Sequence, residues 1–342
     1  MRILIVTDAW RPQVNGVVTT LTRTGECLSA AGHVVHFVTP QAFRTIPCPS
    51  YPEIRLALFA RRRMGRIVES FRPQAIHIAT EGPLGHAARA YCLRRGLPFT
   101  TAYHTRFPQY LRLRAPVPVA LSYAWLRRFH RPAVRTLVPT ETVRRELRGR
   151  GFAHVELWGR GVDGGLFRPR EKHFIDDLRP VALYVGRVAV EKNLESFLSL
   201  ELPGSKYVVG DGPDLEALKA RYPAVRFVGF KHGEELAAYV AAADVFVFPS
   251  RTDTFGLTML EAMAAGVPVA AFPVTGPRDV VLNGVTGILD EDLAAAIGRA
   301  LRLDPADCVK FAASRTWQAC AEQFLSYLAP FDDFPPAQPD AD

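Results

Sequence analysis

The sequence of 342 residues has no lysine before Lys172, few cysteines and no apolar run of about 18 residues. The last absence argues against a transmembrane helix, which needs about 20 mostly apolar residues. The cysteines are odd in number and include no Cys-x-x-Cys pair: Cys27, Cys48, Cys92, Cys308 and Cys320. We therefore expect buried, reduced thiols in a cytosolic protein, without a disulfide or metal framework.

Charge is distributed unevenly along the chain. Residues 1–170 hold 27 arginines and 9 acidic residues, a net charge of +18, whereas residues 171–342 carry a net charge of −10. Arginines are densest at 61–66 and gather again between Arg112 and Arg131. The two halves should therefore face different partners. The basic clusters either bind an anionic surface or are only solvated, and both interpretations stay open here.

Apolar runs alternate with helical stretches through most of the chain. In the first half we predict strands at 3–7, 34–39, 75–79, 99–103, 136–139 and 155–158, with helices at 17–31 and 84–95. In the second half we predict strands at 181–185, 207–209, 226–228, 245–248 and 267–271, with helices at 191–200, 214–221, 234–241 and 255–264. This alternation implies a doubly wound parallel sheet in each half. The glycine-rich segment 161–169 is the expected hinge.

Two pairs of charged residues in the second half suit a nucleotide sugar. Arg187 and Lys192 follow an apolar strand, and two cations can hold a diphosphate. Asp253 and Glu261 flank a Phe-Gly at a predicted helix start, where backbone amides favour anions and a carboxylate can accept hydrogen bonds from hydroxyls. The alternatives are a solvated basic pair and two surface acids.

These motifs occur in the order typical of a known family. The sequence resembles the family 4 retaining glycosyltransferases of the GT-B fold over roughly residues 1–300. Ser-Arg-Thr-Asp-Thr-Phe-Gly at 250–256 and Thr-Gly-Pro-Arg-Asp-Val-Val at 275–281 resemble most the branch that glycosylates membrane lipids. That branch includes glucosyl-, glucuronosyl- and sulfoquinovosyl-diacylglycerol synthases and related GDP-mannose-dependent mannosyltransferases.

The resemblance implies an α/β architecture with two Rossmann-like, doubly wound domains that face a central cleft. The N-terminal domain, 1–168, would face the acceptor and the membrane, and the C-terminal domain, 169–305, would bind the nucleotide sugar. Residues 306–330 would form a helix that returns to the first domain. Residues 331–342, rich in proline and aspartate, would be a disordered tail.

The resemblance also implies roles for four catalytic residues. Arg187 and Lys192 would hold the diphosphate and stabilise charge on the leaving group. Asp253 would contact hydroxyls of the transferred sugar, although the family more often has Glu there. His104, after a predicted strand, would lie near the sugar's reacting carbon, although a structural histidine is the usual alternative. Glu261 would bind the ribose hydroxyls.

A further set of residues is implied to bind substrate: Asn15, Gly16, Arg106, Gly186, Gly210, Asp211, Gly212, Phe230, Lys231, Thr254, Phe255, Gly256, Leu257 and Thr258. Gly210–Gly212 would lie on the phosphate side, and Phe230 and Lys231 would frame the base. Asn15-Gly16 on its own is only a weak turn signal. For residues 255–258, the alternative interpretation is the start of an ordinary capped helix, in which Thr254 or Asp253 is the N-cap.

We therefore expect a retaining hexosyltransferase that uses no metal and no cofactor. It would transfer glucose, glucuronate or mannose from a UDP- or GDP-sugar to a membrane lipid such as diacylglycerol or ceramide. Alternatives are a non-lipid glycan acceptor, a nucleotide-sugar epimerase, or a non-catalytic protein that binds anionic lipid or nucleic acid. We expect a monomer that binds no nucleic acid and lies on the inner face of the cell membrane, since no signal-peptide profile is present.

The segment 118–131 is a candidate membrane contact. Leu121, Trp125 and Phe129 recur at helical spacing among several arginines. A basic amphipathic helix with aromatic residues is typical of an interfacial segment, in which Trp125 and Phe129 would be apolar anchors. The alternative is a helix packed in the core.

Overall fold

The chain folds into two compact units. The structure, a computed structural model, describes residues 1–13, 15–48, 51–109, 118–332 and 334, with the backbone alone for 51–53. Unit 1 comprises Met1–Gly159 and Trp317–Asp342, and unit 2 comprises Arg160–Thr316. The predicted domain boundary at 168 therefore lies inside unit 2, where Val162 N–H donates to the Arg315 carbonyl at 2.8 Å.

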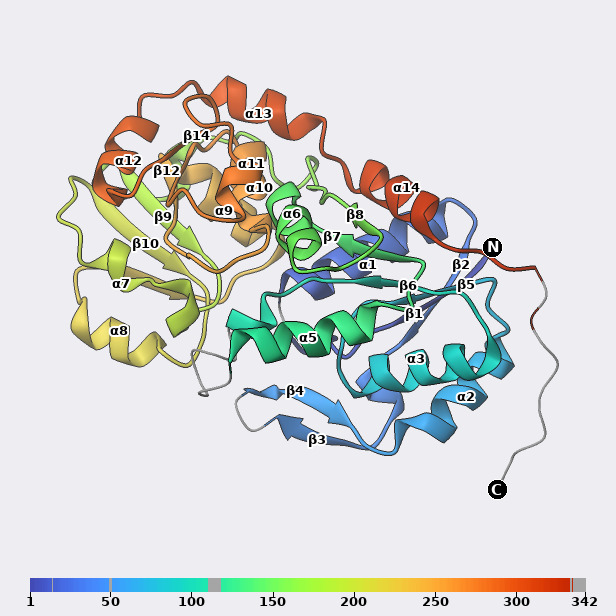
Figure 1. Ribbon diagram of the computed structural model, residues 1–342. Helices are drawn as coiled ribbons and strands as arrows, with labels where there is room; N and C mark the ends of the chain where they lie inside the picture. The colour runs from blue at the N-terminus through green and yellow to red at the C-terminus, as the bar shows by residue number, and fades with distance from the viewer. Residues whose placement is uncertain (14, 49–50, 110–117, 333, 335–342) are drawn as a thin grey trace. The chain divides into compact units, whose positions relative to one another are not determined.

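Unit 1 contains a six-stranded parallel sheet in the order β2-β1-β5-β6-β7-β8 (Figure 1). Its strands are β1 (Arg2–Val6), β2 (Val34–Val38), β5 (Ala75–Ile78), β6 (Thr100–Ala102), β7 (Arg135–Val138) and β8 (Val155–Leu157). An antiparallel hairpin, β3 (Thr45–Cys48) with β4 (Tyr51–Ala57), was not predicted from the sequence.

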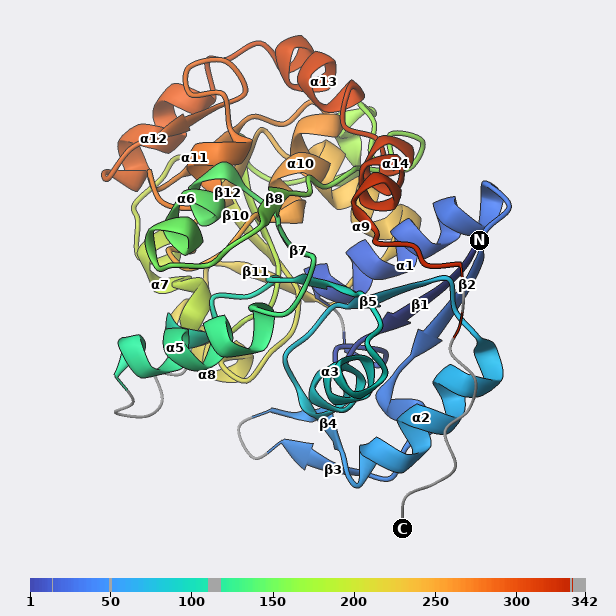
Figure 2. The same cartoon turned by 45° about the vertical axis from the view of Figure 1, so that its right-hand side comes forward.

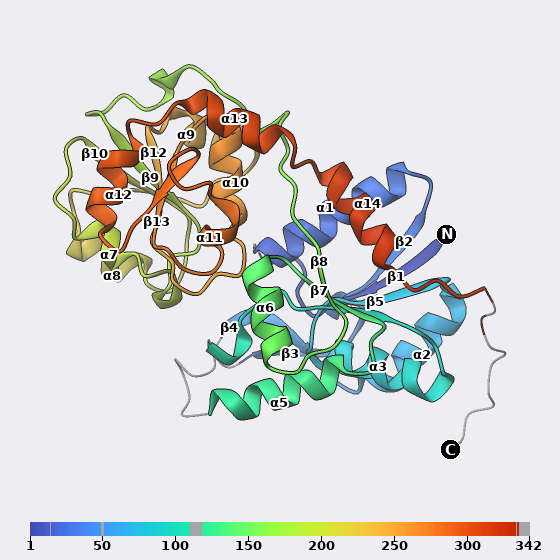
Figure 3. The same cartoon turned by 45° about the horizontal axis from the view of Figure 1, so that its top comes forward.

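Helices cover both faces of this sheet, as Figure 3 shows. They are α1 (Gly16–Ala30), α2 (Ala60–Phe71), α3 (Pro83–Arg95), α5 (Val119–His130), α6 (Glu141–Gly149) and α14 (Trp317–Tyr327), and a 3₁₀ turn, η1, spans Pro40–Ala42. Along β1, Ile3 and Ile5 pack in the cluster that holds residues of α1 and α14, and Leu4 and Val6 pack in the cluster of α2 and α3. The two-residue period of the strand therefore builds two cores.

Unit 2 repeats this architecture with the strand order β11-β10-β9-β12-β13-β14. Its strands are β9 (Val181–Val185), β10 (Ser205–Val209), β11 (Arg226–Gly229), β12 (Val245–Phe248), β13 (Val269–Ala271) and β14 (Gly287–Leu289). Its helices are α7 (Glu195–Leu198), α8 (Leu215–Arg221), α9 (Gly233–Ala242), α10 (Leu257–Ala264), α11 (Pro277–Val280), α12 (Leu293–Ala300) and α13 (Pro305–Ala313), with 3₁₀ turns η2 (Lys172–Phe174) and η3 (Val190–Lys192).

The helices of unit 2 also lie on two faces of its sheet (Figure 2). Residues of α9, α10 and α13 share one buried cluster, and residues of α7, α8 and α12 share the other. The strands are parallel throughout. The prediction of two Rossmann-like doubly wound sheets is confirmed.

Two predicted helices differ from the structure. The helix expected at 191–200 is reduced to the turn η3 and the four-residue α7, because Asn193 between them has a left-handed backbone with φ 54°. The helix expected at 306–330 is two helices, α13 in unit 2 and α14 in unit 1. A segment ending at Thr316 separates them, and Thr316 pairs with Val162 in an isolated bridge.

The end of the chain is better ordered than predicted. Phe331 N–H donates to the Gln74 carbonyl at 2.9 Å, and the rings of Phe331 and Phe334 pack against the cluster of α2 and α3. The expected disorder is therefore wrong for these two residues. Residues 333 and 335–342 of the predicted tail lie outside the described part of the chain.

Helix α5 is amphipathic, but its predicted apolar anchor is only partly correct. Phe129 is buried against α2 and α3, so the prediction that it reaches a membrane is wrong. Leu121 and Trp125 are exposed, at 65% and 43%. The helix therefore packs one face in the core and presents another to solvent.

The loops that follow β9, β10 and β11 are joined by their backbones. The Gly186 amide donates to the Val209 carbonyl at 3.0 Å. The Val188 amide donates to the Asp211 carbonyl at 2.9 Å, and the Gly210 amide donates to the Gly229 carbonyl at 2.9 Å. Gly210 has φ 146°, and a Cβ there would overlap with the Gly186 carbonyl. A side chain at position 210 is therefore excluded by both conformation and space.

We predict that Gly210→Ala lowers the free energy of unfolding of unit 2 by at least about 1–3 kcal/mol, the cost of a strained backbone without counting the overlap. The matched control is Gly298→Ala in α12, where a Cβ meets no atom within 4 Å. It should stabilise by about 0.5–1 kcal/mol, because alanine is the better helix former. Urea unfolding of both variants measures the difference, and equal effects would contradict the close packing at Gly210.

Candidate functional site

Arg187 lies directly after the carboxyl end of β9, at the edge of the sheet where ligands bind in open α/β folds. Its carbonyl accepts a hydrogen bond from the Tyr184 hydroxyl at 2.8 Å, which holds the turn that begins at Gly186. Asp211 accepts from the Gly212 amide at 2.7 Å in the neighbouring loop. The predicted phosphate-side residues Gly186, Arg187 and 210–212 are therefore brought together.

Lys192 and Asp253 form an ion pair, although 61 residues separate them in the chain. Lys192 Nζ lies 2.6 Å from Asp253 Oδ1, and the two side chains are 20% and 16% exposed. The partial burial strengthens the attraction relative to a surface pair. The structure therefore places the predicted diphosphate cation beside the predicted sugar-binding carboxylate.

The elements that carry this pair are tied to each other. The Glu191 carbonyl, in η3, accepts hydrogen bonds from the hydroxyls of Ser250 and Thr252, at 3.4 and 3.2 Å. Asn193 Nδ2 donates to the Pro249 carbonyl at 3.1 Å. The turn after β9 and the loop after β12 therefore form one framework, which sets the Lys192–Asp253 distance.

Asp253 also has a carboxylate oxygen that accepts no hydrogen bond from the described residues. Its second oxygen, Oδ2, is buried and has no hydrogen-bond partner among the described residues. An unsatisfied buried acceptor is costly, so it calls for an explanation such as a ligand. A hydroxyl group of a bound sugar would satisfy this oxygen.

Helix α10 begins beside this carboxylate. Its N-cap is Gly256, with φ 85° and no side-chain cap, so the alternative in which Thr254 or Asp253 caps the helix is wrong. A Cβ at Gly256 would overlap with Met259 and the ring of Phe248. The amides of Leu257 and Thr258 lie in the first turn, where the helix dipole favours an anion.

The other predicted residues of this helix have different surroundings. Phe255 is buried in the core of unit 2, so its side chain has a packing role and only its backbone can serve a ligand. Glu261 lies on α10, four residues after Leu257, and is half-buried. Glu261 therefore stands about one helical turn from the helix start.

The two residues expected to frame the base follow β11. Phe230 is 47% exposed, with its ring 6.1 Å from that of His232. Lys231 Nζ lies 2.6 Å from Glu235 in α9, and the hydrogen bond to Glu235 raises the pKa of this lysine. Lys231 is therefore held by a residue of the helix that follows it, whereas the ring of Phe230 is open to a partner.

In unit 1, Asn15 is the N-cap of α1. Its Oδ1 accepts from the amides of Val17 and Val18, both at 3.0 Å, and its Nδ2 donates to Gln13 at 3.2 Å. The side chain of Asn15 is thus engaged in capping. Gly16, the first residue of this 15-residue helix, is exposed, so its amide is accessible to an anion.

His104 follows β6 at the same edge of the sheet as the loop after β1, because both strands flank β5 in a parallel sheet. The residue is 8% exposed, and its ring lies 5.8 Å from the ring of Trp158 at an interplanar angle of 66°. The imidazole is therefore packed in a defined orientation.

Arg106 is held by a carboxylate that sequence reasoning missed. Glu146, on α6, pairs with Arg106 through Oε2 and accepts from the Tyr123 hydroxyl at 2.8 Å through Oε1. Gln109 donates to Tyr123 at 2.9 Å, and Arg150 lies 3.4 Å from Glu146. One half-buried acid thus positions the loop after His104. Its spacing on α6 is that of an ordinary surface acid, so no sequence signal marks it.

Two other acids at strand ends were also missed. Asp8, after β1, accepts hydrogen bonds from the amides of Leu84 and Gly85 and from the Thr80 hydroxyl. Burial raises the pKa of Asp8 by more than these hydrogen bonds lower it. Glu81, after β5, lies 3.1 Å from the buried His130. Both acids follow the carboxyl ends of strands, where ligands bind in open α/β sheets, so their positions after predicted strands could have identified them.

Neither a metal centre nor a membrane span emerges from the described residues. They contain no group of three or more His, Cys, Asp or Glu side chains that could hold a metal ion. None of their helices combines the length and hydropathy needed to cross a bilayer. Of the five cysteines, all free, Cys92, Cys308 and Cys320 are buried, whereas Cys27 and Cys48 are only half-buried, so the expectation of buried thiols is wrong for these two.

Comparison with known families assigns both units. Residues 14–164 match the family described as Glycosyltransferase Family 4, and residues 179–303 match the family described as Glycosyl transferases group 1. Together these matches cover most of the chain, and each falls largely within one unit.

Similar proteins agree with this assignment. A GDP-mannose-dependent alpha-mannosyltransferase of Mycolicibacterium smegmatis is 33% identical over 84% of each chain. An alpha-monoglucosyldiacylglycerol synthase of Streptococcus pneumoniae is 29% identical over 95% of this chain and 83% of that protein.

Among solved structures, a sucrose-phosphate synthase of Thermosynechococcus elongatus matches with a TM-score of 0.75 and 24% identity, over 95% of this chain and 97% of that one. This likeness shows the fold. With the family matches and the relatives above, it establishes that the chain belongs to the family 4 glycosyltransferases and is a glycosyltransferase.

Proposed function

We propose that this protein transfers a hexose from a nucleotide sugar to a membrane lipid, with retention of configuration and without a metal ion. The observation that carries the proposal is the Lys192–Asp253 pair with its buried, unsatisfied Oδ2. The names of the relatives, a mannosyltransferase and a diacylglycerol glucosyltransferase, support a hexose donor and a lipid acceptor. Mannose and glucose are therefore the first sugars to test.

In this proposal unit 2 binds the donor. The diphosphate lies against Arg187, Lys192 and the amides at the start of α10, which stabilise the negative charge that develops as the nucleoside diphosphate leaves. Asp253 accepts hydrogen bonds from the sugar hydroxyls, and Glu261 accepts those of the ribose. The departing phosphate takes the proton of the attacking hydroxyl, so the reaction needs no separate carboxylate base.

In this proposal unit 1 serves the acceptor. We propose His104 and the amide of Gly16 as the groups of unit 1 that serve the reaction. Glu146 is a positioning residue, because it holds Arg106 two residues after His104. This division of labour agrees with the two charged halves of the chain, since a lipid acceptor is reached at a membrane that is commonly anionic.

We further propose that unit 1 docks on the membrane through its exposed apolar and basic residues. Phe59, at the N-cap of α2, is 93% exposed, and Arg61, Arg62 and Arg63 lie in the first turn of the helix that follows it. Trp125 of α5 adds a second exposed aromatic ring. Aromatic residues beside arginines suit the boundary between headgroups and acyl chains, where the rings insert and the cations meet phosphate.

The direct test is product identification. Purified protein is incubated with GDP-mannose, UDP-glucose or UDP-glucuronate and total membrane lipid in the presence of EDTA, and the products are identified by mass spectrometry. We expect one hexose added to a lipid hydroxyl, with an α-linkage from an α-linked donor. Donor hydrolysis without lipid glycosylation would contradict the lipid acceptor. An epimerised donor, activity restored only by added Mg²⁺, or no reaction with any donor would contradict the proposed reaction.

The positioning role of Glu146 gives a second test. Glu146→Gln removes the charge that holds Arg106, and we expect kcat/KM to fall by roughly 10-fold or more, since hydrogen bonds to charged groups contribute about 1.5–3 kcal/mol. The acceptor KM should change more than the donor KM, and Glu146→Asp should restore part of the loss.

The matched control is Glu141→Gln on the same helix. Glu141, whose side chain is 38% exposed against 19% for Glu146, pairs with Arg144 and Arg145 at 2.7 and 3.6 Å, and pairs within one turn of a helix that face solvent contribute little. Its kcat/KM should stay within about twofold of the parent, a ratio worth only about 0.4 kcal/mol. Thermal unfolding confirms that both variants are folded at the assay temperature. Equal losses in the two variants would contradict the role of Glu146.

A further inference from the structure

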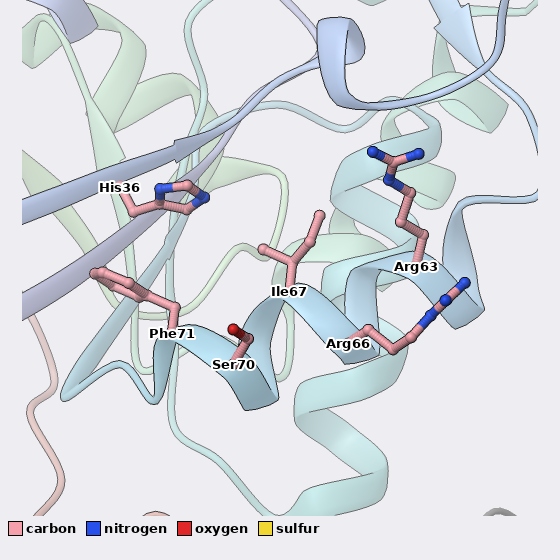
Figure 4. A pocket seen from close by; sticks show the side chains of 6 residues that line it. All are labelled: His36, Arg63, Arg66, Ile67, Ser70 and Phe71. Carbon is pink, nitrogen blue, oxygen red and sulfur yellow. The ribbon is translucent and has the colours of Figure 1, made fainter.

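A surface pocket of about 550 Å³ lies between β2 and α2 in unit 1. Its lining residues are His36, Arg63, Arg66, Ile67, Ser70 and Phe71. Figure 4 shows the rings of His36 and Phe71 at one end, the two guanidinium groups at the other, and Ile67 between them. The pocket therefore has a cationic end and an apolar end.

The cationic end is available to an anion. Arg63 and Arg66 are three residues apart, so they share one face of α2. Among the described residues, no ion pair uses an arginine of α2. The only acid of this helix, Glu69, accepts a hydrogen bond from the Tyr91 hydroxyl at 3.2 Å. Two guanidinium groups and the Ser70 hydroxyl provide donors for several phosphate oxygens.

The apolar end limits the kind of anion. The rings of His36 and Phe71 lie 5.1 Å apart, and the Arg63 guanidinium stands 5.6 Å from the ring of Phe43. A free phosphate would leave this part of the pocket empty, because 550 Å³ is far larger than one phosphate group. A phosphate joined to a glycerol and the first acyl carbons would contact both ends.

The surroundings favour a lipid over a soluble ester. Phe59, one residue before α2, is 93% exposed, and Leu58 is 36% exposed. Transfer of such an exposed apolar ring out of water lowers the free energy, and a bilayer surface beside the pocket would provide the apolar environment.

We propose that this pocket binds the headgroup of an anionic phospholipid with a phosphate monoester, with the phosphate between Arg63 and Arg66 and the glycerol and upper acyl carbons against Ile67 and Phe71. All the residues that line the pocket belong to unit 1. The proposal rests on the membrane docking proposed above and is independent of the hexosyl transfer. It predicts recognition of a headgroup in addition to attraction by charge.

The experiment is vesicle co-sedimentation with the full-length protein. Vesicles contain phosphatidate or phosphatidylglycerol in neutral lipid, adjusted to the same zeta potential. The pocket variant is Arg63→Ser with Arg66→Ser. The control is Arg61→Ser with Arg62→Ser, which removes the same charge from the same helix but no residue that lines the pocket. All four arginines are exposed, so both variants should fold.

We expect the parent to bind phosphatidate vesicles several-fold more tightly than phosphatidylglycerol vesicles. The pocket variant should lose about tenfold more affinity for phosphatidate than the control does, because it loses directed hydrogen bonds as well as long-range attraction. Equal losses in both variants, or equal affinity for the two lipids, would show diffuse electrostatic binding and overturn the pocket.

A calorimetric titration with sn-glycerol 3-phosphate identifies the source of the phosphate. Saturable binding of this soluble ester, lost in the pocket variant, at an affinity equal to that for the vesicles would overturn the lipid assignment. Absence of such binding supports the lipid. Transfer to acceptor in detergent micelles, measured on the same variants, separates the two proposals: the pocket variant should retain the parent's micellar rate, and a loss there would place the pocket in catalysis.

Discussion

The ion pair between Lys192 and Asp253 is the contact around which the proposed donor site of unit 2 is organised. It joins the turn after β9 to the loop after β12 at a distance of 2.6 Å, and the carbonyls of Glu191 and Pro249, one on each side, accept hydrogen bonds that support it. Each charge neutralises the other, which offsets the cost of partial burial. A diphosphate and a sugar would later replace this mutual contact with contacts of their own.

Regular features of this chain were readable from its residues. The buried strands were predicted because parallel strands covered on both faces are continuous apolar runs, as at Val181–Val185. The order of the motifs predicted the family. The shortened helix at 191–200 was missed because Asn193 adopts a left-handed conformation, which no periodicity reveals. Phe129 was misplaced because helical spacing does not say which face of α5 meets the core.

The features that could not be predicted are mainly contacts between residues that lie far apart in the sequence. No sequence pattern predicts that Lys192 pairs with Asp253 or that Glu146 pairs with Arg106, because these contacts arise from the packing of separate loops and helices. The acids at strand ends, Asp8 and Glu81, form an intermediate case, since fold class and strand position together point to them.

The two units use their charges differently. In unit 2, cations are commonly satisfied within the unit: Lys172 and Arg179 both contact Asp244, at 2.8 and 2.7 Å. In unit 1, the arginines of α2 remain on the surface, beside an exposed phenylalanine. A net charge of +18 over residues 1–170 is repulsive by itself, so its retention is consistent with an anionic partner.

The most direct measurement of the account is the affinity of nucleoside diphosphates for two variants of the central pair. Titration of GDP and UDP should show that Lys192→Ala weakens binding of the preferred nucleotide by at least about tenfold, because a contact to a charged phosphate is lost. Asp253→Asn should leave that binding unchanged or make it tighter, because it removes the anion that competes with phosphate for Lys192. Equal weakening in both variants, or no change in either, would contradict the assignment of this pair to the donor site.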